Sequence, residues 1–255
     1  LGIMAGVFIA LGGATSSTAA HAVENVGVAR ALAGVIFPVG LMLIVFLGGE
    51  LFTGNCLIIM DVFDKRVTWA GLFRDLFIVF FSNLIGALCV DVLIVFSGNL
   101  NYSGGLLGAY TIKVAVSKIA ISPVQGITSG ILCNILVCLA VLMATSARDI
   151  AGKVWAIFFP IMAFVVGGFE HCVANMFYIP VGMMAAQNPA YVAKAQEAYG
   201  LTAEQIQGLT VLHSLNNFIP VTIGNILGGM VFVGIPCYFI YKKKWQKWHE
   251  ESKNA

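Results

Sequence analysis

The sequence predicts an all-α membrane protein with six transmembrane helices in two inverted three-helix repeats, the second and fifth helices being broken. Three observations lead to this fold class. Hydrophobic residues make up 59% of the 255 residues and charged residues 10%, whereas a soluble domain has about 25% charged residues. The apolar runs are long enough for several membrane spans of ~20 residues each. Finally, short sequence matches relate the two halves of the chain.

Hydropathy and the turn-rich breaks define the spans. They place the apolar runs at about residues 1–20, 31–62, 76–97, 115–146, 154–186 and 209–241. A continuous helix over residues 31–62 would be ~48 Å long, against a hydrocarbon core of ~30 Å. The run at 154–186 is similarly long. Both contain glycines and polar residues near the middle, in GGELFTGN (Gly48–Asn55) and GGFEHCVAN (Gly167–Asn175). Because non-helical backbone survives at membrane depth only inside protein or beside a watery cavity, we expect a break in each.

The internal repeat makes these two breaks equivalent. GIMAGV (Gly2–Val7) matches GITSGI (Gly126–Ile131), and NLIGAL (Asn83–Leu88) matches NILGGM (Asn225–Met230), in the same order around the breaks. Each half has an odd number of spans, so the halves cross the membrane in opposite directions, and a substrate path is expected where the broken helices meet. We interpret residues 1–255 as one channel domain, with repeat one at about 1–97, repeat two at about 115–241 and a cytoplasmic tail at 242–255.

The basic residues predict the orientation of the chain. With a cytoplasmic N-terminus, the inner loops and the tail hold ten of the fourteen basic residues. The outer side then holds Arg30, Lys113, Lys118 and Lys194. The positive-inside rule therefore predicts that both termini are cytoplasmic.

Enzymatic and metal-binding functions find no support in the motifs. No pair of the six cysteines has the short spacing of a metal or redox motif, and H-E-x-x-H is absent. His171 and Cys172 are adjacent in the sequence, so they cannot face each other as base and nucleophile. We expect no metal and no cofactor. A neutral-solute pore of the aquaporin type stays open as an alternative, although the paired Asn-Pro-Ala motifs are missing from both breaks.

Ionisable residues inside spans are functional candidates, because a charge at the bilayer centre costs roughly 2.5–3.5 kcal/mol. Four residues qualify: Glu50, Asp91, Glu170 and His171. Histidine exchanges protons near neutral pH, which suits proton exchange with a permeating solute, although a lone histidine also serves as a packing residue. A carboxylate can accept from the backbone N–H groups that a broken helix exposes, so we interpret Glu50 and Glu170 as braces for the loop amides. Asp91 is assigned no role beyond a hydrogen bond between helices or subunits.

Four segments resemble the signature segments of the formate/nitrite transporter family of bacterial anion channels. They are GGELFTGN, GILCNILVCLAV (Gly130–Val141), GFEHCVANMFYIPVG (Gly168–Gly182) and NNFIPVTIGNILGG (Asn216–Gly229). The resemblance implies an aquaporin-like protomer and a homopentamer with one pore per protomer in the bacterial cytoplasmic (inner) membrane. It also implies permeation of formate, nitrite or hydrosulfide. Ile135 after Asn134 favours the formate and hydrosulfide branches over the nitrite branch, with hydrosulfide preferred.

The resemblance also assigns roles to individual residues. It implies a central pore histidine at His171 and a threonine at Thr53 in the loop that breaks the second span. It also implies an apolar constriction at Leu41 and Phe164, with Phe37 on the other side of the pore. Lys118 would make the approach to the pore positive, and Asn134 and Asn225 would be polar residues near the path. The residues alone leave open whether Thr53 orients His171, binds the anion or caps the following half-helix. They also leave open whether Lys118 attracts anions or is an interfacial anchor. The implied mechanism is that an anion shares a proton with His171 and crosses as, or nearly as, the neutral acid.

Overall fold

The structure, a computed structural model, describes residues 1–241 as helices joined by short loops, with no strand in that range. Six helical segments are long and apolar enough to cross a membrane. They are α1 (Gly2–Ala20), α2 with α3 (Val26–Ile36 and Val39–Leu47), α6 (Trp69–Phe96), α8 (Pro123–Ser146), α9 (Ile150–Gly167), and α13 (Val211–Ile226), which continues through the π-helix η3 (Leu227–Gly234) to Tyr241. The predicted all-α fold class with six membrane helices is confirmed.

Both predicted breaks are present. The second span ends with α3 and resumes as α4 (Phe52–Asn55), η1 (Cys56–Ile58) and α5 (Ile59–Phe63). The fifth span ends with α9 and resumes as α10 (Cys172–Ala185). The short second parts, Phe52–Phe63 and Cys172–Ala185, are apolar helices that are not long enough to cross a membrane.

The fourth span begins later than the hydropathy predicted. Residues 115–119 belong to a separate helix, α7 (Tyr102–Ile119), and α8 starts at Pro123. The Ser122 hydroxyl accepts from the Gln125 amide, and the Gln125 side chain accepts from the Ser122 amide. This capping box, with proline at the first helical position, fixes the start of α8. The expected continuous span 115–146 is therefore wrong at its N-terminal end.

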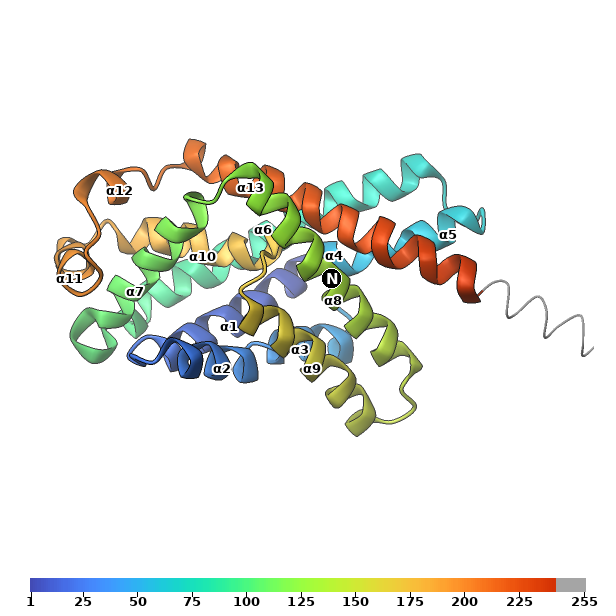
Figure 1. Cartoon of the computed structure of the whole chain (residues 1–255), viewed down its shortest axis with the longest axis horizontal. Coiled ribbons are helices and arrows are strands. Elements are labelled where there is room, and N and C mark those ends of the chain that lie inside the picture. Colours follow the sequence, from blue (N-terminus) through green and yellow to red (C-terminus); the bar gives the residue numbers. More distant parts are fainter. Residues whose placement is uncertain (242–255) are drawn as a thin grey trace, which may run out of the picture.

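The two ends of the molecule differ in structure (Figure 1). At one end, α7 packs with α11 (Pro189–Tyr199), α12 (Ala203–Gln207) and the short η2 (Asn99–Asn101) around a small apolar core of its own. At the other end lie α5 and the last turns of the helix that follows α13 (Figure 1). The predicted tail at 242–255 lies outside the described residues. We call the first end the vestibule end, for the cavity described below.

Glycines allow close helix crossings in both repeats. A Cβ on Gly86 of α6 would collide with the Ile3 carbonyl of α1, and a Cβ on Gly228 would collide with the Ile131 carbonyl of α8. Small residues at such crossings let helix backbones approach closely within a membrane. Gly86 and Gly228 are equivalent in the repeat, so the residues they contact, Ile3 and Ile131, are equivalent too. This aligns GIMAGV with GILCNI, which starts at Gly130. The predicted match to GITSGI is therefore displaced by one helical turn.

Candidate pore and vestibule

A glycine in the left-handed conformation ends the first half of each broken helix. Gly48 follows α3 with φ of 81°, and Gly168 follows α9 with φ of 69°. This conformation is unfavourable for residues with a side chain and common for glycine after a helix. The glycines therefore let the chain leave the helix partway along the second and the fifth span.

Two asparagines hold the non-helical loops in the same way. Asn83 Oδ1 accepts from the Phe52 amide at 3.0 Å, while its Nδ2 donates to the carbonyls of Gly2 at 2.8 Å and Glu50 at 2.9 Å. Two of these bonds satisfy backbone groups at the break, the Phe52 amide and the Glu50 carbonyl, and the third ties the loop to α1 through Gly2.

Asn225 makes the equivalent contacts in the second repeat. Its Oδ1 accepts from the Cys172 amide at 2.9 Å, and its Nδ2 donates to the carbonyls of Gly130 and Glu170, both at 2.9 Å. The hydrogen bonds of the two repeats thus correspond atom for atom.

Asn134 and Asn225 were expected near the path, and the structure places them behind the loops. Both are fully buried, and neither lines the two cavities described below. Asn134 Nδ2 donates to the Thr53 carbonyl at 3.2 Å and to the Asn225 carbonyl at 2.6 Å. These asparagines therefore fix the loop backbone.

The brace predicted at Glu50 is wrong. Glu50 is exposed, and its carbonyl oxygen, not its carboxylate, is held by Asn83. Among residues 1–241, no hydrogen bond to the Glu50 side chain is found. An amide can donate to carbonyls and accept from N–H at once, which an ionised carboxylate cannot do. This explains why asparagines hold the loops.

Glu170 is buried, but its carboxylate does not bind loop amides either. Its Oε1 accepts from Lys118 Nζ at 2.6 Å, and its Oε2 accepts from Asn175 at 2.7 Å and from Asn217 at 3.2 Å. Asn217 also donates to the Lys118 carbonyl at 2.9 Å. Lys118 is therefore a partner of Glu170, and its charge is neutralised locally.

His171 lies at the start of α10 and is 2% exposed. Its Nδ1 accepts from the Ala174 amide at 3.0 Å, and its Nε2 lies 3.0 Å from Thr53 Oγ1. Because Nδ1 is used as an acceptor, the neutral ring carries its proton on Nε2 and donates it to Thr53. Thr53 does not cap α4, whose start has no side-chain cap. Of the three roles left open for Thr53, the structure shows contact with His171.

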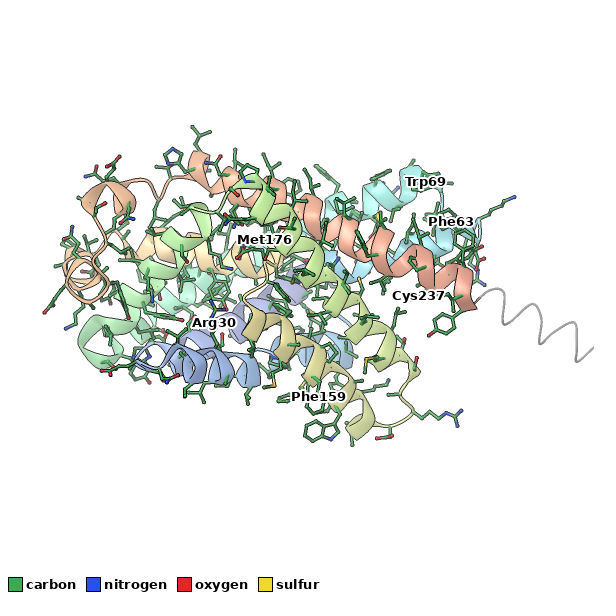
Figure 2. The ribbon with its side chains drawn as sticks, viewed as in Figure 1. Arg30, Phe63, Trp69, Phe159, Met176 and Cys237 are labelled. Atoms are coloured by element: carbon green, nitrogen blue, oxygen red, sulfur yellow. The ribbon has the colours of Figure 1, made fainter. Side chains whose placement is uncertain are left out.

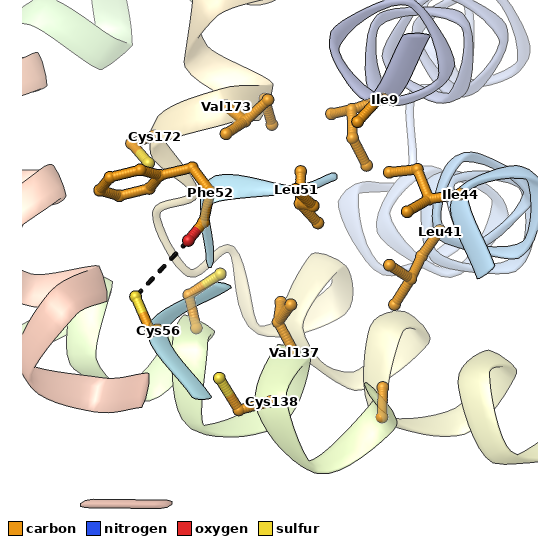
Figure 3. Close-up of a cluster of buried hydrophobic side chains, with 14 of the residues drawn as sticks. Ile9, Leu41, Ile44, Leu51, Phe52, Cys56, Val137, Cys138, Cys172 and Val173 are labelled. Carbon is orange, nitrogen blue, oxygen red and sulfur yellow. Dashed lines mark hydrogen bonds between the residues drawn. The ribbon is translucent and has the colours of Figure 1, made fainter. Parts of the chain in front are cut away.

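An apolar chamber adjoins His171. It has a volume of about 10 Å³ and is lined by Ile9, Phe37, Leu41, Leu51, Val137, Ile161, Phe164 and His171. Figure 3 shows Ile9, Leu41, Leu51 and Val137 arranged around the same space. A space of this size is at the lower limit for one water molecule. The chamber is a narrow apolar space beside the polar His171–Thr53 pair.

A larger cavity opens at the vestibule end and extends to His171. This vestibule has a volume of about 640 Å³. Phe37, Phe164 and His171 line both the vestibule and the chamber, whereas Leu41 lines only the chamber. The rings of Phe37 and Phe164 meet edge to face with centroids 5.5 Å apart, and Phe164 stacks on His171 at 5.8 Å. The two phenylalanines thus lie together at the boundary between the cavities, with Leu41 beyond them.

Several residues of this site were not predicted. Leu51 and Val137 line the chamber, and Asn83, Asn175 and Asn217 hold the polar network. Leu51 could have been found, because it precedes α4 as His171 precedes α10. Asn83 was already aligned with Asn225 in the repeat. Asp91 is fully buried in α6, and within residues 1–241 neither of its carboxylate oxygens has a hydrogen-bond partner.

A six-helix membrane protein whose two broken helices meet around a buried histidine and a narrow apolar passage is a channel or transporter. Comparison with known proteins gives the family: residues 1–239 match the family model described as formate/nitrite transporter. The chain therefore belongs to the formate/nitrite transporter family. Membership in this family of channels and transporters excludes the alternative of an intramembrane enzyme.

Named relatives and a solved structure agree with this assignment. The chain is 38% identical to the probable formate transporter of Methanothermobacter thermautotrophicus, over 96% of this chain and 88% of the relative. It is 36% identical to formate channel FocA of Escherichia coli strain K12, over 96% and 86%. A solved pentameric formate channel with formate bound matches with a TM-score of 0.81 and 34% identity, covering 94% of each chain.

Proposed function

We propose that the protein is a channel for small monovalent anions of weak acids, with formate as the main permeant. The relatives and the matched structure are named for formate, which favours this anion over the hydrosulfide that the sequence preferred. Nitrite and hydrosulfide are kept as further permeants. The observation that carries the proposal is the Thr53–His171 contact, which joins the two broken helices between the vestibule and the apolar chamber.

Entry is favoured by the charge of the vestibule. Three basic side chains, Arg30, Lys113 and Lys118, and two acidic ones, Glu24 and Glu170, line it, which leaves one net positive charge with the histidines neutral. A positive funnel raises the local concentration of anions. This proposal keeps Lys118 in the substrate path as part of the polar wall, with its charge offset by Glu170.

Passage is selective because the constriction excludes water. Phe37, Phe164 and Leu41 offer no polar group, so an ion that keeps its hydration shell is blocked. At this point an anion can accept the Nε2–H of His171, which otherwise donates to Thr53. The hydrogen bond lowers the cost of dehydrating the anion.

Complete proton transfer to the anion needs a second proton on the ring, because a neutral imidazole that gave up its Nε2 proton would become an anion. The second proton would bind Nδ1, which now accepts from the Ala174 amide. Protonation therefore breaks the cap of α10, and the loss of a helix cap costs about 1 kcal/mol. In this proposal the proton is shared while the cap opens, so that the permeant crosses as, or nearly as, the neutral acid.

Assembly and location complete the proposal. We place the protein in the bacterial cytoplasmic membrane as a homopentamer with one pore per protomer and both termini cytoplasmic. The matched pentameric formate channel supports the assembly, and the positive-inside rule supports the orientation. A detergent-corrected mass equal to five protomers is expected, and the mass of a monomer or dimer would contradict it.

The substrate is tested by flux into proteoliposomes, with formate, nitrite and hydrosulfide measured side by side at the same pH. We expect formate to enter faster than through protein-free vesicles and at least as fast as the other two anions. Uptake of hydrosulfide alone would overturn the assignment of formate. Entry of glycerol at a similar rate would favour the neutral-solute pore instead.

A further inference from the structure

The three basic side chains of the vestibule differ in what surrounds them. Lys118 is paired with the buried Glu170 carboxylate at 2.6 Å. Lys113 Nζ lies 4.7 Å from the ring centroid of Tyr199 and 5.8 Å from that of Tyr110. Arg30 has no carboxylate within ion-pair distance among residues 1–241. Lys113 has no carboxylate partner there either, but its ammonium lies over two tyrosine rings, so Arg30 is the basic residue of the vestibule with neither an ion pair nor an aromatic contact in the described residues.

Arg30 lies against the second break and, like His171, lines the vestibule. Its Nη1 donates to the Val166 carbonyl at 3.4 Å. A Cβ built on Gly168 would collide with Nη1 and lie 3.2 Å from Cζ and 3.3 Å from Nη2, so the guanidinium packs against this glycine. Figure 2 labels Arg30, which α2 carries to the start of the loop after α9. The absence of a side chain at Gly168 leaves the room that the guanidinium occupies.

We propose that Arg30 is an anion-binding residue of the vestibule that selects planar anions with two oxygens over anions with one binding atom. With Nη1 on the Val166 carbonyl, the edge formed by Nε and Nη2 stays without a hydrogen-bond acceptor in the described residues. Two parallel N–H groups on this edge match the two oxygens of a carboxylate. Formate and nitrite have this shape, and hydrosulfide does not.

The inference rests on the proposed function, because it concerns which of the proposed permeants the same channel prefers. Formate or nitrite would be held at Arg30 before it reaches Phe37 and Phe164. A lysine at this position would keep the charge but lose the planar pair of donors. Charge and shape can therefore be separated by substitution.

The experiment compares wild type, Arg30→Lys and Arg30→Gln in proteoliposomes, with Arg74→Lys as the matched control. Arg74 is also exposed but lies outside the vestibule lining. Because exposed ion pairs contribute up to about 1 kcal/mol, we expect Arg30→Lys to lower formate and nitrite uptake by roughly two- to fivefold at low anion concentration. Hydrosulfide uptake should stay within about twofold of wild type. Arg30→Gln should lower the uptake of all three anions, and Arg74→Lys none.

A binding measurement separates failure of this inference from failure of the proposed function. Broadening of the ¹³C-formate resonance by purified protein reports binding without transport, and it should be weaker with Arg30→Lys than with wild type or Arg74→Lys. An unchanged ratio of formate to hydrosulfide uptake, or equal broadening by all variants, would overturn the role of Arg30. Wild type that binds formate without passing it would leave the Arg30 site in place and refute the formate channel.

Discussion

At the residue scale, each broken helix depends on one amide side chain. The side chains of Asn83 and Asn225 each bind a backbone N–H and a carbonyl of the broken loop, and one carbonyl of a neighbouring helix. A buried polar group that loses its partner costs about 1–3 kcal/mol. Each asparagine therefore stabilises its loop far more than an exposed residue would.

Replacing Asn225 by alanine tests this directly. The change leaves the Cys172 amide and the Gly130 and Glu170 carbonyls without this partner, so the free energy of unfolding should fall by about 3 kcal/mol or more. Asn83→Ala should have a similar effect. Asn25→Ala, which removes one exposed helix cap, should cost about 1 kcal/mol. Thermal unfolding in detergent measures all three, and equal losses would contradict the bracing role.

The Lys118–Glu170 pair gives a second prediction. Lys118→Met should destabilise the protein by about 3–5 kcal/mol, because it leaves a buried carboxylate without its cation. The double variant Lys118→Met, Glu170→Gln should recover part of this loss, since glutamine is neutral and its oxygen can still accept from Asn175 and Asn217. Thermal unfolding of the single and double variants measures this recovery of stability. If the double variant is no more stable than Lys118→Met, the pair is not the source of the effect.

At the element scale, the breaks follow from backbone conformation. Gly48→Ala should cost about 1–2 kcal/mol for the left-handed conformation alone, because nothing lies within 4 Å of the position of its Cβ. Gly168→Ala should cost more, because it must also displace Arg30. Thermal midpoints of the two variants provide the comparison. A larger loss for Gly48→Ala would show that the conformation and contacts described for the loops are wrong.

The sequence predicts the helices and their breaks better than their ends. Long apolar runs and glycine-led polar stretches indicate six spans and two breaks, as the structure has them. The start of α8 was missed because hydropathy is continuous from α7, whereas a capping box at Ser122 separates the two helices. Caps of this kind depend on single residues, which an average over a window of ~19 residues hides.

The site was predicted by position more than by contact. The resemblance and the break placed His171, Thr53, Leu41, Phe37 and Phe164 near one another, and they are near one another in the structure. Sequence could not show that Lys118 would reach Glu170, since 52 residues separate them. Nor could it show that asparagines would hold the loops, because hydrogen-bond geometry depends on the packed fold.

At the scale of the whole molecule, the inverted repeat yields two similar loops with different end residues. Leu51 and His171 occupy equivalent positions, and both line the chamber. The loop of the first repeat supplies the apolar Leu51 and, two residues later, Thr53. The loop of the second repeat supplies the titratable ring of His171. This difference between two symmetry-related loops is the reason that the proposed proton sharing involves His171 and not Leu51.

The most direct test of that role is formate uptake by His171→Asn and wild-type protein over about two pH units around pH 6.5, the midpoint for an ordinary imidazole. Asparagine is a good helix N-cap, so α10 should keep its start while the titratable group is lost. Wild-type uptake should rise as the pH falls, because protonation of His171 supplies the shared proton, and the profile of His171→Asn should be flat by comparison. If uptake by both proteins increases equally as the pH falls, at equal protein stability and with the same ranking of anions, proton sharing at His171 is contradicted.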